Sequence, residues 1–469
     1  MKRYSNYEFI SARWYNQIPI HWHLIRIKDL ISQSNAGAWG DDPETDNGTI
    51  CLRVADMDFN LGVFKNKPVS VLTKRLYTEE QIEKLTLEQG DILIEKSGGG
   101  EKLPVGRSVY FDKSYPALFA NFMQRIRFKH KLIDAHFASY LLRTMYYRGA
   151  TWYYVKQTTG IQNLDLNSML AQERFPVPPR EEQDQIVRYL NWQVSKINRL
   201  IAAKRKEIEL LEAASAHYIE TIIRNGIHNE KLTRTGNPWI EMAPASWKKV
   251  RHKNILTEKK NTVGENYNQY TLLSLTTKGV IIRDTSTGKG KYPSDFSTYQ
   301  IVQPSDMIFC LFDVDETPRT VGLSSHTGMI TGAYTVYEVH DVLPEFLLNY
   351  FIVIDNKKGF KPLYSGLRKV IGKDVFARQT IFLPSIEEQK EIVDAIKKQQ
   401  AKVKRTMTFF QQEIELLHAL RTRLISDVVT GQIDVRDIEI PDVEYTPETD
   451  DNGEDTDDEE SDDMAEEGV

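Results

Sequence analysis

The feature that most constrains the fold of this chain is an internal repeat. A pattern of two tryptophans and a proline recurs after 225 residues: Trp14, Pro19 and Trp22 match Trp239, Pro244 and Trp247. Two later segments recur after 206 residues: Glu181–Gln183 matches Glu387–Gln389, and Glu207–Leu211 matches Glu413–Leu417. Because several ordered matches share one register, one structural unit is predicted to occur twice in tandem.

The segments enclosed by these matches differ between the two copies. The first, from Trp22 to Gly160, is 19 residues longer than the second, from Trp247 to Gly366. Within these segments the resemblance between the copies nearly vanishes. A shared frame around dissimilar contents indicates two modules that dock in the same way but recognise different things.

The early part of each copy has strand-like character. Short apolar runs, separated by Gly, Asn, Pro and Asp, lie at 25–27, 91–94, 108–111 and 123–128, and again at 270–275, 279–283, 307–312 and 334–339. Between Asp134 and Tyr147 the apolar residues have helical spacing, and Asp134 is a suitable N-cap. The combination is typical of an α+β domain.

Each copy then ends in a long predicted helix. From Glu181 to about Arg224 the chain has no Pro or Gly, and its apolar residues recur at steps of three and four, as they do in the second copy. Each helix would run for about 45 residues, or roughly 65 Å. Prolines precede both helices and Gly226 and Gly431 follow them. A helix of this length with one apolar stripe needs a partner, and the other copy is the obvious one.

Composition sets further bounds. A length of 469 residues favours at least two domains. Cys51 and Cys310 fit neither a disulfide framework nor a zinc site, which indicates a reducing compartment. No apolar run is long enough for a signal peptide or a membrane span, so a soluble cytoplasmic protein without a membrane partner is expected.

The charge is segregated along the chain. Residues 441–469 hold 15 acidic and no basic residues, and subtracting these 15 from the total of 66 leaves 51 acidic against 60 basic residues. The body therefore carries a balance of +9, which permits nucleic-acid binding. The acidic tail lacks a usable apolar set and is predicted to be disordered.

Common catalytic motifs are absent from the sequence. The glycine-rich segment at 96–102 lacks the order of a P-loop, no segment has the Asn/Asp-Pro-Pro-aromatic motif of adenine methyltransferases, and 91–96 lacks the Glu-x-Lys spacing of metal-dependent nucleases. His21 and His23 have no further Cys or His residues at a zinc-site spacing. We therefore expect no catalytic residue and no metal site in this chain.

The repeated frame resembles the specificity subunits of Type I restriction–modification enzymes. The resemblance covers about 14–436 and is carried by Ile18-Pro19 with Trp22, by Pro178-Pro179 with Glu181–Gln183, by their second copies, and by the closing segment 429–436. The loop at 95–107, with Gly98 to Gly100, is also similar to loops of target-recognition domains. The acidic tail is not part of this pattern.

The resemblance implies an α+β fold with two target-recognition domains in a tandem pseudo-repeat, separated by two long helices that form an antiparallel coiled coil. The expected boundaries are 1–178 for the first target-recognition domain, 179–225 for the first spacer helix, 226–237 for a linker, 238–384 for the second target-recognition domain, 385–431 for the second spacer helix and 432–469 for a C-terminal segment ending in the acidic tail.

The resemblance also implies a function. Each globular domain would read one half of a bipartite, asymmetric target in double-stranded DNA, while the helix pair sets the spacer and docks two modification subunits. Restriction subunits would join this complex. S-adenosylmethionine, ATP and Mg are expected on those partner subunits, whereas this chain is expected to hold no cofactor and to be non-catalytic.

Candidate site residues are the polar and basic residues of the glycine-containing loops. In the first domain they are Lys96, Ser97, Lys102, Arg107, Gln157, Thr158, Gln162 and Asn163, and in the second Arg283, Lys289, Lys291, Arg319, Arg368 and Lys369. The outer helix faces offer a candidate surface for partner subunits: Glu182, Gln183, Arg188, Glu388 and Gln389. A solvated surface or a structural turn is the alternative for each position. The four repeated tryptophans are expected to pack within the frame.

Two other functions are compatible with the sequence. One is a coiled-coil adaptor that binds proteins without DNA specificity. The other is a fragment of a fused restriction–methylation enzyme whose catalytic part lies elsewhere, although the complete two-copy frame argues against it.

Overall fold

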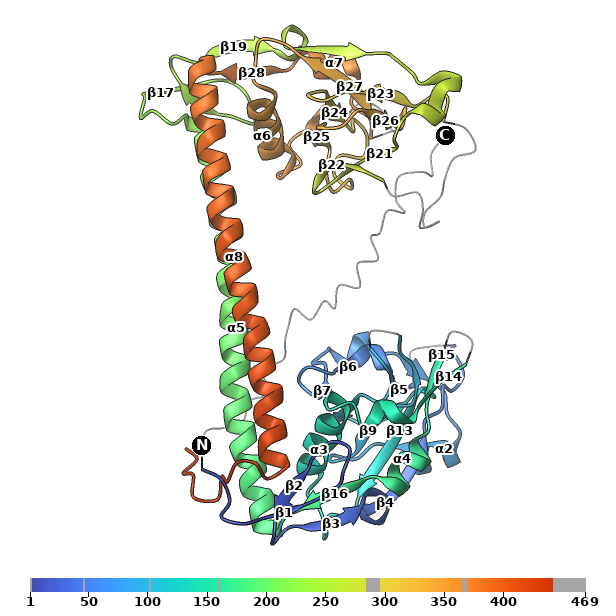
Figure 1. Ribbon diagram of the computed structural model, residues 1–469. Coiled ribbons are helices and arrows are strands. Elements are labelled where there is room, and N and C mark those ends of the chain that lie inside the picture. Colours follow the sequence, from blue (N-terminus) through green and yellow to red (C-terminus); the bar gives the residue numbers. More distant parts are fainter. Residues whose placement is uncertain are drawn as a thin grey trace. The chain divides into compact units, whose positions relative to one another are not determined.

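The structure, a computed structural model, describes residues 2–44, 47–100, 103–158, 161–283, 296–364 and 369–441, although the side chain of Thr158 is not described. These residues form two compact units. The first consists of 2–206 with 410–441, and the second of 207–409. The predicted acidic tail at 442–469 lies outside the described residues. Figure 1 labels most of the helices and strands of both units.

The first unit is built around a six-stranded sheet. Its strand order is β4-β13-β9-β11-β7-β6, and the unit also has the three-stranded sheets β12-β5-β8 and β10-β15-β14 and the pairs β1-β2 and β16-β3. The strands are β1 (Tyr7–Phe9), β2 (Gln17–Pro19), β3 (His23–Arg26), β4 (Ile31–Ala36), β5 (Thr49–Leu52), β6 (Met57–Asp58), β7 (Val63–Phe64), β8 (Lys74–Arg75), β9 (Ile92–Glu95), β10 (Ser97–Gly98), β11 (Ser108–Tyr110), β12 (Ala117–Phe119), β13 (Met123–Phe128), β14 (Val155–Thr158), β15 (Ile161–Leu164) and β16 (Arg174–Val177).

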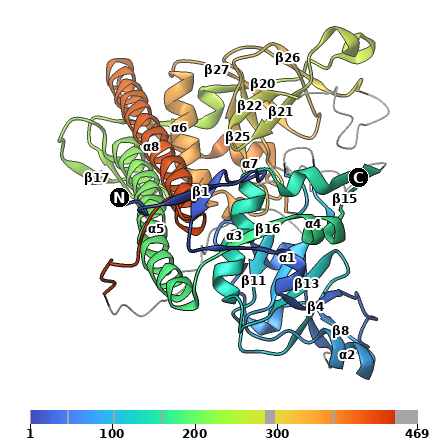
Figure 2. The ribbon, with the colours of Figure 1, turned by 60° about the horizontal axis from the view of Figure 1, so that its bottom comes forward.

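The shorter α-helices among the described residues of this unit are α1 (Ile27–Leu30), α2 (Glu79–Leu85), α3 (Ala135–Tyr147) and α4 (Leu166–Gln172). The α3 helix begins where the sequence predicts, because the Asp134 carboxylate accepts a hydrogen bond from the backbone N–H of Phe137 at 3.0 Å. Figure 2 shows α3 beside the large sheet near β11 and β13, which it contacts. Its inner face buries Phe137 and Leu141 completely.

The second unit is built around the four-stranded sheet β20-β27-β24-β25, with the pairs β17-β18, β19-β28, β21-β22 and β23-β26. Its elements are β17 (Leu232–Arg234), β18 (Met242–Pro244), β19 (Lys248–Arg251), β20 (Leu256–Lys259), β21 (Leu273–Thr276), β22 (Gly279–Ile282), β23 (Gln300–Val302), β24 (Met307–Phe309), β25 (Val321–Leu323), β26 (Gly328–Ile330), β27 (Thr335–Val339), α6 (Pro344–Asp355), α7 (Lys373–Arg378) and β28 (Thr380–Leu383). Its core is strongly aromatic, since the Phe309 ring lies 4.9 Å from both Phe351 and Phe376.

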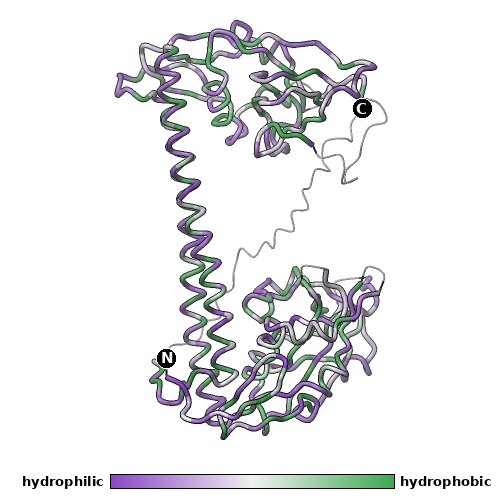
Figure 3. Tube along the Cα trace, in the orientation of Figure 1, coloured by the Kyte–Doolittle hydropathy of each residue, from purple (hydrophilic) through white to green (hydrophobic). Residues whose placement is uncertain are grey.

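The two long helices are α5 (Arg180–Asn225) and α8 (Ile386–Val429), close to the predicted bounds. Both end at the predicted glycines, where Gly226 and Gly431 have φ values of 74° and 72°. Apolar and polar stretches alternate along both helices in Figure 3. Most of the predicted apolar stripe is buried, for example Ile186, Leu190 and Ile392 at 0% exposure, but Tyr218 is 38% exposed.

Segments of both helices run antiparallel within each unit. In the first unit the start of α5 lies beside the end of α8, where Gln185 Nε2 donates to the carbonyl of Val435 at 3.0 Å. In the second unit the end of α5 lies beside the start of α8: Gly226 packs so closely against Glu388 that a Cβ at this glycine would lie 2.6 Å from Oε1 of Glu388. The predicted fold class, α+β with a tandem repeat and two long antiparallel helices, is confirmed.

The repeat extends further than the sequence pattern indicates. The hairpin of β1 and β2 recurs as β17 and β18, displaced by the same 225 residues. In consequence, the polar segment at 226–237, expected to be a linker, contains the strand β17.

The two ends of the described chain meet within the first unit. The backbone N–H of Asp434 donates to the carbonyl of Lys2 at 3.0 Å, and the side chains of Gln17 and Gln432 share a hydrogen bond of 2.7 Å. The Tyr7 hydroxyl donates to the carbonyl of Gly431 at 3.0 Å. The segment that follows α8 therefore occupies the place beside β1 and β2 that the end of α5 takes beside β17 and β18.

Candidate nucleic-acid interface

Two separately predicted segments of the first unit come together in one small sheet. β10, from the glycine-rich segment, pairs with β15, which also pairs with β14. In this register Ser97 lies opposite Asn163, and Gly98 lies opposite Gln162. On the other side of β15, Lys156 lies opposite Asn163 and Gln157 opposite Gln162. The fold thus places the predicted polar residues around 97 and around 160 in direct contact.

The strand register decides which of these side chains share a face. Directly opposite residues in a ladder point to the same side of a sheet, so Ser97, Asn163 and Lys156 form one row, which we call the polar row. Asn163 and Lys156 are exposed and Ser97 is half-exposed. The Ser97 hydroxyl donates to Asn163 Oδ1 at 2.7 Å. The polar row presents a hydroxyl, an amide and an ammonium, which are group types that contact phosphates and base edges.

Lys156 is not among the candidate DNA contacts predicted from the sequence. The alternation of side chains along a strand places it on the opposite face from Gln157, and that period of two is the signal that could have pointed to it. It lies directly opposite the predicted Asn163. Its ammonium lies 2.6 Å from the Asp165 carboxylate while its side chain remains 71% exposed. Because an ion pair at such an exposed position contributes little, Lys156 can exchange this partner for a phosphate at low cost.

Gln162 is a correction to the prediction. It lies on the other face from the polar row and is only 7% exposed. Its amide oxygen accepts a hydrogen bond from the backbone N–H of Val105 at 3.2 Å, and its NH₂ donates to the carbonyl of Gly100 at 3.3 Å. Gln162 therefore shapes the glycine-rich loop from within, whereas Gln157, opposite it on the edge strand, is exposed.

The basic candidates of this loop differ from one another. Lys96 is half-exposed at the start of the loop, and Lys102 lies outside the described residues. Arg107 is bound within its unit: Nε and Nη2 donate to the two carboxylate oxygens of Glu95 at 3.0 and 3.1 Å, and its guanidinium lies 3.8 Å from the centre of the Phe59 ring. Since Glu95 is buried, this bidentate pair holds the end of the loop on the large sheet.

The second unit places a different chemistry at the corresponding position. There, Asp313 N–H donates to the carbonyl of Lys369 at 2.8 Å and Ile371 N–H to that of Leu311 at 2.7 Å, so the segment after β24 pairs as the segment after β9 does. It carries the acidic residues Asp313, Asp315 and Glu316. A hydrogen bond from the Tyr364 hydroxyl and an ion pair with Lys361 lower the pKa of Asp315 to about 2.

The predicted basic residues of the second unit are largely engaged or undescribed. Arg319 Nη1 donates to Asp355 Oδ2 at 3.1 Å and is 18% exposed, so it supports its own unit. Lys369 pairs with Glu316 and lies 3.7 Å from Asp315. Arg283 is half-buried and directly follows β22. For Thr158 of the first unit, only its position in β14 is described. Lys289, Lys291 and Arg368 lie outside the described residues.

The predicted partner-binding residues need a second correction. Glu182, Gln183, Glu388 and Gln389 were expected on outer helix faces, but their exposures are only 7%, 1%, 7% and 1%. Each glutamate accepts a hydrogen bond from a tryptophan indole, Trp22 to Glu182 at 3.1 Å and Trp247 to Glu388 at 3.2 Å.

The two glutamines also face inward and act alike. Gln183 Oε1 accepts from the N–H of Asp134 at 2.7 Å, and Gln389 Oε1 accepts from the N–H of Leu343 at 2.8 Å. These four side chains therefore hold each long helix against the globular part of its own unit, because their oxygens accept hydrogen bonds from indole and backbone N–H groups of that part. Arg188 alone is exposed as predicted.

The same contacts explain the repeated tryptophans. Trp14, Trp22 and Trp247 are buried, and Trp239 donates its indole N–H to the carbonyl of Gly359 at 2.7 Å. The prediction that they pack in the frame is confirmed. The two units thus share a repeated set of buried hydrogen bonds. They differ in the polar row of the first unit and the acidic segment at the corresponding position of the second.

Comparison with known proteins agrees with this architecture. Residues 19–210 match the family model described as the type I restriction modification DNA specificity domain. This part of the chain is therefore similar to such specificity domains. The resemblance to Type I specificity subunits found in the sequence is confirmed, and the polar row lies inside the matched residues.

Two relatives of the specificity domain come from Methanocaldococcus jannaschii. One is the type I restriction enzyme MjaVIII specificity subunit, 25% identical over 219 residues, which are 46% of this chain and 48% of the relative. The other is the putative MjaX specificity subunit, 24% identical over 236 residues, 50% of this chain and 52% of the relative. The chain thus spans about half the length of the relatives it matches.

A solved structure shares the fold of most of the chain. It belongs to work on complex assembly and conformational transition of the type I R-M system, and it aligns with a TM-score of 0.59 at 14% identity, covering 89% of this chain and 99% of that chain. In the described ranges, no helix is both long and apolar enough to cross a membrane.

Proposed function

We propose that this chain is the DNA sequence-recognition subunit of a type I restriction–modification complex. Each globular part reads one half of a bipartite, asymmetric target in double-stranded DNA, and the pair of long helices sets the unread spacer and docks two modification subunits. Restriction subunits complete the assembly. The chain itself performs no catalysis.

This proposal rests on one contrast between the two units: their buried hydrogen bonds are alike, whereas their exposed polar residues differ. The buried Trp–Glu hydrogen bonds recur at 3.1 and 3.2 Å in the two units. The exposed surface at the corresponding sheet positions changes from the polar row to the acidic segment around Asp315. Two heads held alike with unlike surfaces suit an asymmetric target, because base-edge contacts specify sequence whereas phosphate contacts only position the protein.

The partner subunits would supply the chemistry. S-adenosylmethionine for adenine methylation, and ATP and Mg for translocation and cleavage, would be bound by the modification and restriction subunits. The residues of this chain would orient the DNA and leave the reacting base to its partners.

The direct test is the pattern of modified adenines in the host genome with and without this gene. One interrupted motif is expected to lose its methylation when the gene is deleted. An unchanged pattern, together with unaltered methylation by the purified complex, would favour the adaptor alternative.

The polar row allows a sharper test. Replacing Asn163 or Lys156 by Ala is expected to weaken binding to an oligonucleotide carrying that motif by roughly tenfold, since a good base contact contributes about 1–3 kcal/mol. Gln89→Ala is the matched control, because Gln89 is an exposed amide of the same unit outside this sheet. Gel-shift titration measures the affinities. Equal affinities for all three variants would exclude the polar row from the interface.

A further inference from the structure

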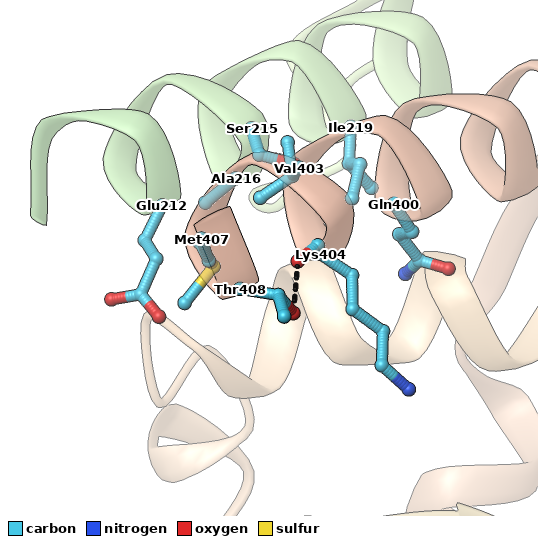
Figure 4. Close-up of a pocket in the computed structure, with 9 residues that line it drawn as sticks. All are labelled: Glu212, Ser215, Ala216, Ile219, Gln400, Val403, Lys404, Met407 and Thr408. Atoms are coloured by element: carbon cyan, nitrogen blue, oxygen red, sulfur yellow. Dashed lines mark hydrogen bonds between the residues drawn. The ribbon is translucent and has the colours of Figure 1, made fainter. Parts of the chain in front are cut away.

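The helix pair of the second unit contains an open groove that the sequence did not predict. The groove has a volume of about 590 Å³. Ser215 and Ile219 of α5 and Val403 and Met407 of α8 line the groove, together with Glu212 and Gln400. All of these residues belong to the second unit. Figure 4 shows the two helices side by side, with Ser215, Ile219 and Val403 where they meet and with Glu212 and Gln400 extending outward at opposite ends.

The first unit shows what fills the corresponding position there. The displacement of 206 residues maps Ser215 onto Arg421 and Lys404 onto Asn198. Arg421 is only 4% exposed, and its Nη1 donates to Asn198 Oδ1 at 2.6 Å while Nη2 lies 3.0 Å from His418 Nδ1. A guanidinium therefore lies between the helices of the first unit, where an amide oxygen and a ring nitrogen receive it.

The apolar residues next to this position are also more exposed in the second unit than in the first. Ile201 and Ile425 of the first unit are 1% and 4% exposed. Their counterparts after the same displacement, Met407 and Ile219, are both half-exposed. The second unit thus has a hydroxyl where the first has a long guanidinium, and the apolar residues that would flank it are left partly uncovered. The groove corresponds to the missing arginine.

The chemistry of the groove suits an arginine from another molecule. Ile219, Val403 and Met407 offer apolar walls for an aliphatic stem. The Glu212 carboxylate, at the position of His418, and the Ser215 hydroxyl offer acceptors for a guanidinium on one side of the groove.

One like charge also lines the groove. Lys404 is exposed, and in Figure 4 its extended side chain carries the ammonium away from Ser215 and Ile219. Its charge is compatible with an arginine held at the Glu212 side, since two cations screened by water repel each other weakly.

We propose that this groove receives an arginine side chain presented by a partner protein, and that the first unit cannot accept the same side chain because Arg421 already fills its position. The two ends of the helix pair would then dock partner proteins unequally. The identity of that partner rests on the proposed function, in which the modification subunits bind the helices.

A first experiment tests the groove chemistry without any partner or DNA. The full chain is labelled with ¹³C-methyl methionine, and the Met407 methyl signal is assigned with Met407→Leu. N-acetyl-arginine methylamide is expected to shift this signal in a saturable way in the millimolar range, whereas the neutral citrulline analogue and the glutamate analogue are not. A response to citrulline or glutamate equal to the response to arginine would overturn the proposal.

Matched variants place the response in the groove. Ser215→Arg combined with Lys404→Asn copies the arrangement of the first unit and is expected to abolish the shift and raise Tm. Ser215→Leu, which fills the groove without a charge, serves the same purpose if the double variant does not fold. Arg421→Ser opens the first unit and should leave the Met407 response unchanged. A filled variant that still responds would refute the assignment.

A second experiment separates this proposal from the function on which it rests. The filled variant is expected to bind motif DNA as the wild type does, but to bind one of two modification subunits at least tenfold more weakly by calorimetry. If the wild-type chain itself did not bind motif DNA, that result would contradict the proposed function and not the arginine groove. Equal affinity of filled and wild-type chains for both subunits would contradict the arginine groove.

Discussion

At the scale of single residues, burial separates the residues that hold the frame from those available for recognition. Glu182 accepts hydrogen bonds from Tyr4 at 2.6 Å and Trp22 at 3.1 Å and pairs with His21 at 2.8 Å. A carboxylate with several donors around it is stable when buried, because each donor replaces a lost water contact. Glu182 is therefore engaged inside its own unit, and its predicted position on an outer helix face is wrong.

His252 gives a residue-scale prediction about pH. It is fully buried, with its ring 4.7 Å from Phe376, and burial lowers its pKa to about 4 from an unfolded value of about 6.5. The unfolded chain therefore binds a proton that the folded chain excludes, and stability falls as the pH falls from about 6.5 toward 4. The loss is at most about 1.4 kcal/mol per pH unit.

The repeat supplies the test variant, because the counterpart of His252 in the first unit is Ile27, which is also fully buried. His252→Ile is expected to flatten the pH dependence of urea unfolding between pH 7 and pH 5. His130→Ala, at an exposed histidine, is the control and should keep the wild-type slope. A slope unchanged by His252→Ile would mean that other groups cause the acid sensitivity.

The candidate site could be predicted from the sequence only in part. Residue type and glycine content located the segments around Ser97 and Asn163, which the structure brings together. Composition could not reveal that Gln162 faces inward or that Glu95 neutralises Arg107, because strand register and long-range pairing decide both. The DNA contacts proposed for Lys96, Ser97, Gln157 and Asn163 stay predictions.

At the scale of elements, the helices were easier to predict than the strands. Prolines, apolar periodicity and closing glycines gave bounds for α5 and α8 within about two residues, because these features act locally. The runs at 91–94, 108–111 and 123–128 became β9, β11 and β13, but 307–312 stays a strand only to Phe309. The pairing of β10 with β15 joins residues far apart in the chain, and no local pattern indicates it.

The ends of the long helices give an element-scale prediction. Gly431 has a φ of 72°, and a Cβ there would lie 2.4 Å from Cδ of Pro19. Gly431→Ala is expected to destabilise the first unit by roughly 2–4 kcal/mol, since left-handed strain adds to a clash with a rigid ring. Hydrogen exchange should then accelerate in the peptides that contain 2–17 and 432–438.

Variants of two other glycines distinguish the two causes of the lost stability, which are the backbone strain and the clash with Pro19. Gly226→Ala meets the end of the Glu388 side chain, which can move, so its effect should be smaller. Gly236 has a φ of 68° and nothing within 4 Å of its Cβ, so Gly236→Ala measures the backbone strain alone. If all three variants lose the same stability, the contact with Pro19 is unimportant.

At the scale of the whole molecule, α5 and α8 are each continuous over 46 and 44 residues. On the proposed function their length sets the spacer of the DNA target. Inserting four residues after Lys206 and after Gln412, which match in the repeat, lengthens both helices by about 6 Å. The preferred spacer is expected to grow by about two base pairs, since duplex DNA rises about 3.4 Å per base pair.

Methylation sequencing of the reconstituted complex would measure the new spacer. An insertion into α5 alone is the control, because it shifts the apolar stripes out of register and should abolish methylation. A complex with both insertions that still modifies the original spacer would show that helix length does not determine it.

The meeting of Lys2 with Asp434 and of Gln17 with Gln432 has a consequence for the order of folding. Among the described residues, the second unit uses the single stretch 207–409, and so this stretch can fold while the ribosome is still translating. The first unit combines residues made before the second unit, 2–206, with residues made after it, 410–441. We therefore expect the half of the molecule that is synthesised first to be the one that matures last.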